Sequence, residues 1–229
     1  MEPGTAAPPP WLDHVADVLF PEAGLRAGWT DRVERELVRH QGQLPMAAVH
    51  AWQCAGDPLL TGPEHRAVGA LHRRTLTGRP SPEPVWRAAL EPALRDLFTR
   101  AYPYRDAYAE AAAAAGAYAR ANGYAEGDAR QYGEVYARQN TDTNRLAHVE
   151  ANTVAGAAAL AAAYAAGQPD GYAATFPHAR VGAVVTAYAD GDPGRARRAR
   201  ERIAAGLLHA LAGPVGADGT DGTDGSVSP

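Results

Sequence analysis

The chain has 229 residues, enough to bury a substantial core in one large helical domain or two small ones. Its formal net charge of −4 is too small to indicate nucleic-acid or anionic-membrane binding by itself. The single cysteine excludes an intrachain disulfide framework and is typical of a reducing compartment.

Helical periodicity recurs along the first half in segments separated by proline and glycine, and no period-2 run of β-branched residues indicates a strand. Thr30 is expected to cap one helix, and Pro92 to kink or divide another. The helices expected here span residues 10–20, 29–41, 45–54, 63–77 and 82–101.

The second half contains longer alanine-rich helices. One opens at Pro103 and ends at Asn122 and Gly123, a typical C-terminal pair. The others are expected at residues 125–166, 177–189 and 193–212. We therefore predict an all-α, Ala-rich multi-helix bundle with one long helix in the C-terminal half and disordered termini.

Composition divides the chain into regions. All four tryptophans precede residue 100, and all ten tyrosines follow residue 101. The sequence leaves open whether the two central regions are one domain or two. The regions are a disordered start (1–10), a Trp-bearing helical region (11–101), a Tyr/Asn-bearing Ala-rich helical bundle (102–212) and a disordered tail (213–229).

Nothing in the sequence indicates a membrane protein. The first ten residues lack the basic start and apolar run of a signal peptide. The longest apolar run, 154–166, is shorter than the roughly 20 residues that span a bilayer. We expect a soluble, cytoplasmic protein.

All four asparagines lie between residues 118 and 152, in a chain that has no lysine and only one isoleucine. On a helix, a series of neutral polar side chains recurs here every four residues. We call this series the Tyr/Asn/His ridge: Tyr132, Tyr136, Asn140, Asn144, His148 and Asn152. The opposite side of the helix is expected to form a core stripe of Val135, Leu146, Val149, Thr153 and Leu160.

The absence of charge from the ridge bears on function, because a helix face left to water usually collects charged residues. Neutral hydrogen-bonding groups beside small residues favour the approach of another helix, a second copy of the chain, or a small neutral organic ligand. A polar network between alanine-lined helices, or a solvated face without charge, would give the same pattern. We expect a binding or interaction protein that uses the ridge for docking or self-association.

The first alternative is a cofactor-independent helical enzyme of a specialised biosynthetic pathway. In that case His148 is the candidate general acid or base, and Tyr136 the candidate donor to a developing oxyanion. The chain contains no GxSxG, P-loop or GxGxxG motif that would favour a particular chemistry.

Histidine is plentiful, but its spacing does not favour a metal centre. Glu36 with His40, and His65 with His72, are spaced so that each pair could face one ion. No ExxH motif of the di-iron type is present. We expect surface or capping histidines, with no metal and no cofactor.

The second alternative is a DNA-associated regulator that uses the N-terminal helices and the arginine-rich segment 195–202. Glu201 lies within this segment, and Asp218, Asp221 and Asp224 follow it. This pattern is more typical of a solvated helix start near an acidic tail, and nucleic-acid binding is not expected.

Overall fold

In the computed structural model, residues 9–213 are described, and no strand occurs among them. The predicted all-α fold with one long helix is confirmed. None of the described helices combines the length and apolar character that a bilayer crossing needs. The helices are α1 (Pro10–Leu19), α2 (Ala23–Arg39), α3 (Met46–Gly56), a 3-10 turn η1 (Asp57–Leu59), α4 (Pro63–Leu76), α5 (Glu83–Ala101), α6 (Tyr104–Ala121), α7 (Glu126–Ala166), α8 (Pro169–Ala173), α9 (Pro177–Ala189) and α10 (Pro193–Ala212). Disorder was expected at 1–10 and 213–229, of which 1–8 and 214–229 lie outside the described residues; Pro10 corrects this expectation, because it is the first residue of α1.

Three local expectations need correction. Helix α2 begins at Ala23, so Thr30 is not a cap; its hydroxyl donates to the carbonyl of Arg26 (3.1 Å), a bond made inside a helix. Pro92 lies within α5 without dividing it. The short helix α8 was not predicted from the sequence.

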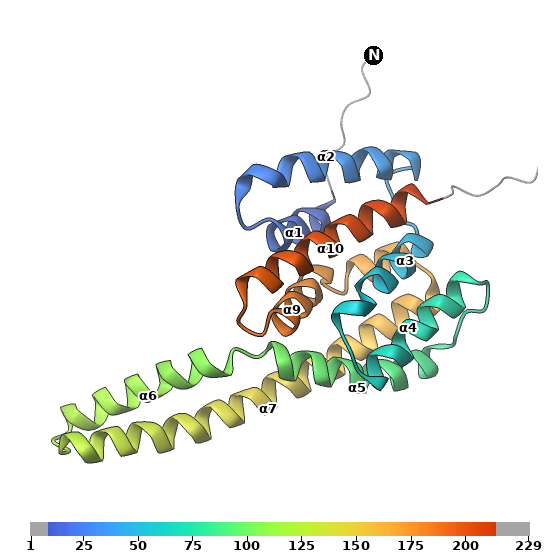
Figure 1. Ribbon diagram of the computed structural model, residues 1–229. Helices are drawn as coiled ribbons and strands as arrows, with labels where there is room; N and C mark the ends of the chain where they lie inside the picture. Colours follow the sequence, from blue (N-terminus) through green and yellow to red (C-terminus); the bar gives the residue numbers. More distant parts are fainter. Residues whose placement is uncertain (1–8, 214–229) are drawn as a thin grey trace, which may run out of the picture.

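The helices form a body and a projecting arm (Figure 1). Helix α6 and the first half of α7 run antiparallel and extend away from the remaining helices. We define the arm as residues 104–145, the part of this hairpin over which α6 and α7 contact each other. Helix α7 has 41 residues and is about 60 Å long at 1.5 Å per residue, so it forms one side of the arm and then enters the body.

The two helices of the arm pack through small residues. Gly116 and Gly133 face each other, and a Cβ atom added at Gly133 would lie 2.6 Å from the carbonyl oxygen of Ala112. Alanines complete the contact on both helices. Because small side chains allow close approach, the arm is held by backbone proximity rather than by large apolar groups.

The predicted core stripe of α7 is wrong at two of its five positions. Val135 and Leu146 are 53% and 67% exposed, whereas Val149, Thr153 and Leu160 are buried. The arm buries the small residues Gly133 and Ala137 instead, because α6 approaches α7 too closely to leave room for larger side chains.

The body has one core, to which both compositional regions contribute. The Trp29 indole donates to the carbonyl of Ala204 (3.1 Å), and the Trp52 indole donates to the carbonyl of Ile203 (2.9 Å). These two bonds fix α2 and α3 of the first region against α10 of the second. Regions 11–101 and 102–212 therefore share one core.

Candidate functional site

The Tyr/Asn/His ridge lies on the surface of α7, beside its buried side. Apart from Asn144, each ridge residue directly precedes a buried position of the helix. Tyr132, Tyr136, Asn144 and His148 are exposed, and Asn140 and Asn152 are half-buried. The ridge is therefore a continuous exposed edge of the arm that continues onto the body.

Two groups of rings lie along the ridge. At the tip of the arm, the Tyr132 ring lies between those of Tyr124 and Tyr136, with centroid distances of 6.0 and 6.4 Å. Where the arm meets the body, the His148 ring packs against Tyr102 (5.6 Å). The rings of the ridge thus contact a neighbour on α7, a residue of the preceding turn and a residue that follows α5.

The ridge does not gather its candidate catalytic residues into one site. The Asn152 amide donates to the carbonyl of His148 (2.7 Å) and lies 3.3 Å from His148 Nδ1, so it can orient that ring. Tyr136, however, is twelve residues away, a rise of about 18 Å along the helix. Within one chain, a small substrate cannot touch both Tyr136 and His148, which removes the expected oxyanion donor from the His148 site.

A second group of polar residues, which the sequence did not reveal, lies inside the body. Six elements contribute to a cluster of aromatic, imidazole and guanidinium groups. We call it the interior cluster: His50 and Gln53 of α3, His72 of α4, Trp86 of α5, Tyr164 of α7, Tyr172 of α8 and Arg180 of α9.

Two buried histidines form the centre of the interior cluster. Nδ1 of His50 lies 2.7 Å from Nδ1 of His72, so one ring donates and the other accepts. The Trp86 ring stacks on His50 (5.8 Å), and Tyr164 meets His72 edge-on (4.9 Å). The expectation of surface or capping histidines is wrong for His50, His65 and His72, which are 2%, 8% and 1% exposed.

The surroundings of this pair favour neutral imidazoles. Burial lowers the pKa of His50 to about 4. Burial lowers the pKa of His72 well below 6.5, and the positive charge of Arg180 adds to that effect. Both rings are therefore neutral near pH 7.

Several polar atoms of the interior cluster have no partner among the described residues. Nε2 of His72, Nε1 of Trp86 and Nε of Arg180 are buried without a hydrogen bond. The Arg180 Nη1 donates to the Tyr164 hydroxyl (2.8 Å), and Arg180 belongs to none of the ion pairs among the described side chains. Unpaired buried polar atoms are rare in folded proteins and point to water or a ligand.

These atoms lie next to two small crevices. The first has a volume of about 50 Å³ and the second about 40 Å³. Gln53, Gly56, Arg180 and Val184 line both, so the two adjoin each other. The first is otherwise lined by Leu60, His65, Val68, His72, Leu90, Ala93, Leu94 and Leu97, which makes it an apolar space with a few polar groups.

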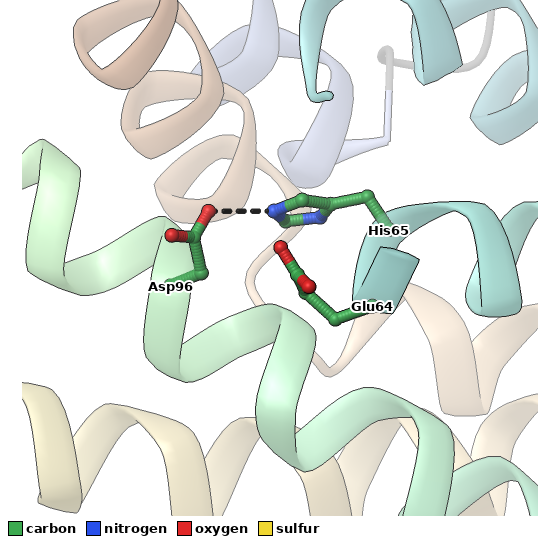
Figure 2. A group of neighbouring side chains, drawn as sticks. All are labelled: Glu64, His65 and Asp96. Carbon is green, nitrogen blue, oxygen red and sulfur yellow. Dashed lines mark hydrogen bonds and ion pairs between the residues drawn. The ribbon is translucent and has the colours of Figure 1, made fainter. Parts of the chain in front are cut away.

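Glu64, His65 and Asp96 form a further group at the edge of the first crevice (Figure 2). Their candidate ligand atoms lie within 4.8 Å of one another, and their types suit a divalent metal. In the structure, His65 Nε2 lies 2.8 Å from Asp96, and Arg100 also reaches that carboxylate (3.4 Å). The His65–Asp96 contact joins α4 to α5 and fixes the His65 ring in the crevice wall, whereas Arg100 and Asp96 both lie on α5.

The two residue pairs whose spacing could have let them share a metal ion do not do so. His65 pairs with Asp96 and His72 with His50, so His65 and His72 do not face one ion. Glu36 pairs with Arg39. His40 bonds the carbonyl of Leu211 (3.0 Å).

Three arginines of the arginine-rich segment contact other residues of the same chain. Arg195 covers the ring of Tyr188 (4.9 Å), and Arg197 pairs with Glu201 (3.8 Å). Arg202 donates to the carbonyl of Ala55 (2.9 Å). The expected contact with the acidic tail lies outside the described residues.

No protein-family model matches the chain, and comparison with curated proteins and with solved structures gives no match. The exposed ridge and the interior cluster are therefore the two candidate functional sites considered below.

Proposed function

We propose that the protein is an interaction protein whose arm docks against a second copy of the chain through the Tyr/Asn/His ridge. One observation carries the proposal: more than half of the large apolar side chains that lie exposed in the described part of the chain are on α6, α7 or the turn between them. They are Tyr118, Tyr124, Tyr132, Val135, Tyr136, Leu146 and Val154. Five of these seven residues lie within the arm, and exposed large apolar groups gathered on a projecting element are typical of a docking surface.

The chemistry of the ridge favours a second copy as the partner. In a two-fold symmetric interface the same patch meets itself, so a face carrying one sign of charge would repel its own copy. The ridge has no charged residue, and tyrosine hydroxyls and asparagine amides both donate and accept hydrogen bonds. Such a face can satisfy itself across a two-fold axis.

The architecture of the arm supports the same arrangement. A hairpin of two helices has no helices on its outer sides, whereas two hairpins together form a four-helix bundle. Tyrosines are the side chains that most often anchor interfaces, because they bury a large ring while keeping a polar tip. Tyr132 and Tyr136 near the tip of the arm would be such anchors.

The double substitution Tyr132→Ser and Tyr136→Ser is expected to weaken self-association at least about tenfold, because both ring anchors are lost. Sedimentation velocity over a range of protein concentrations measures the dimer dissociation constant. Val38→Ser is the matched control, since Val38 is 75% exposed on α2, away from the arm, and its loss is expected to leave association unchanged. A wild-type chain that stays monomeric at high concentration would contradict the proposal.

A second pair of variants tests the polar part of the ridge. His148→Ala and Asn144→Ala are expected to weaken association together, because they remove hydrogen-bonding groups from the same face. If both variants keep wild-type melting and oligomeric state, the polar part of the ridge has no part in docking.

A further inference from the structure

We propose that the adjoining crevices of the interior cluster form a binding site for a small organic carboxylate, held by the Arg180 guanidinium and by Nε2 of His72. This site is separate from the ridge and does not depend on self-association. It shares no residue with the arm.

The charge of the site selects an anion. Arg180 is half-buried, its Nε is fully buried, and none of the ion pairs among the described side chains includes it. Its one hydrogen bond in the cluster goes to a neutral phenol, the Tyr164 hydroxyl (2.8 Å). A half-buried guanidinium without a counterion favours an anionic ligand, and its planar fork matches a carboxylate.

A second polar side chain belongs to the lining of the same space. His72 lines the first crevice, and its Nδ1 is already engaged by His50 (2.7 Å). The other ring nitrogen, Nε2, is buried and has no partner among the described residues. When His72 Nδ1 accepts from His50, the neutral ring carries its proton on Nε2, which leaves a donor available to a ligand.

Size and lining define the ligand further. Crevices of about 50 and 40 Å³ suit a molecule of only a few heavy atoms. Leu90, Leu94 and Val184 provide apolar parts of the lining. A short aliphatic carboxylate places its oxygens on Arg180 and its methyl or ethyl group against these walls.

The test compares propionate with propionamide, which has the same shape without the charge, on the full-length wild-type chain. At a propionate concentration about ten times its dissociation constant, the melting temperature is expected to rise by about 3–6 °C. Propionamide and an equal concentration of sodium chloride are expected to leave it within about 1 °C. Equal responses to propionate and chloride would overturn the proposal.

Two variants assign the effect to Arg180. Arg180→Lys keeps the charge but loses the fork, and it is expected to weaken propionate binding at least tenfold. Arg87→Gln is the matched control, because it removes an exposed arginine that pairs with Glu83 on its own helix, and it is expected to bind as the wild type does. A full propionate response in Arg180→Lys would overturn the assignment.

A readout on the wild-type chain covers the case in which Arg180→Lys does not fold. The Nε–H signal of Arg180 in a ¹H–¹⁵N spectrum is expected to shift on titration with propionate and to stay in place with propionamide. If propionate leaves that signal unmoved up to saturation of the melting-temperature effect, the ligand binds elsewhere and the proposal fails.

Discussion

Acidification from pH 7 to pH 4 is expected to lower the free energy of unfolding by about 3 kcal/mol through His50 alone. Burial lowers the pKa of this imidazole from 6.5 in the unfolded chain to about 4 in the folded protein. At roughly 1.4 kcal/mol per pH unit, that difference corresponds to about 3 kcal/mol. His72, whose pKa is also lowered by burial, acts in the same direction.

The sign follows from which state binds the proton more tightly. Above pH 6.5 both imidazoles are neutral in the folded and the unfolded chain, so the stabilisation is fully present. Between pH 6.5 and about 4 the unfolded chain takes up protons that the folded chain excludes, and stability falls. The contact between the two Nδ1 atoms holds one proton, so it opposes protonation of both rings together.

Charged neighbours act on the pair from two helices. Arg180 of α9 and Arg73 of α4 both lower the pKa of His72. The phenols of Tyr164 and Tyr172 remain neutral in this range, because burial raises their pKa above 10. The two arginines therefore oppose protonation of the pair, and the two phenols add no negative charge that would favour it.

Urea denaturation at a series of pH values measures the effect. His50→Asn keeps a hydrogen-bonding group near Nδ1 of His72 but cannot titrate, so it is expected to reduce the fall between pH 6.5 and 4 and to leave the part that His72 contributes. His209→Asn, which removes an exposed histidine, is expected to retain that fall. A wild-type stability that stays constant from pH 7 to pH 4 would show that the pair is not buried as described.

The sequence predicted the helices well because their signals are local. Glycine and proline at helix ends placed α7, α9 and α10 within about two residues of their observed bounds. The end of α6 was predicted from Asn122 and Gly123, and Gly123 does adopt a left-handed conformation, with φ of 84°.

The buried side of the arm could not be predicted from apolar periodicity. That pattern selects large side chains, such as Val135 and Leu146, whereas the arm buries Gly133 and Ala137. Which side of an alanine-rich helix is covered depends on how closely its partner approaches, and that distance is set by residues on the other helix, such as Gly116.

The interior cluster was missed for a related reason. Helical spacing relates residues only within one helix, here Glu36 to His40 and His65 to His72. The observed pair joins His50 of α3 to His72 of α4, and Arg180 arrives from α9. Only the tertiary fold brings these residues together. The available signal was the presence of histidine between apolar residues of a predicted helix, as in the segment around His50.

Gly133→Ala is expected to lower the free energy of unfolding by about 1–3 kcal/mol, although alanine is the better helix former. The new Cβ would lie 2.6 Å from the carbonyl oxygen of Ala112 and 3.2 Å from the backbone nitrogen of Gly116. Both atoms belong to the backbone of α6 and cannot turn aside as a flexible side chain could. Helices α6 and α7 must therefore move apart, and their close alanine contacts weaken.

Gly28→Ala is the matched control, because Gly28 lies inside α2 with no atom within 4 Å of an added Cβ. There the same substitution is expected to raise stability by about 0.5–1 kcal/mol through helix propensity alone. Urea denaturation measures both changes, and hydrogen exchange of the α6 amides places the Gly133 effect in the arm. If Gly133→Ala is as stable as the wild type, helices α6 and α7 are not in backbone contact. The buried side of α7 in the arm would then differ from the one described, and the exposed position of the ridge would differ with it.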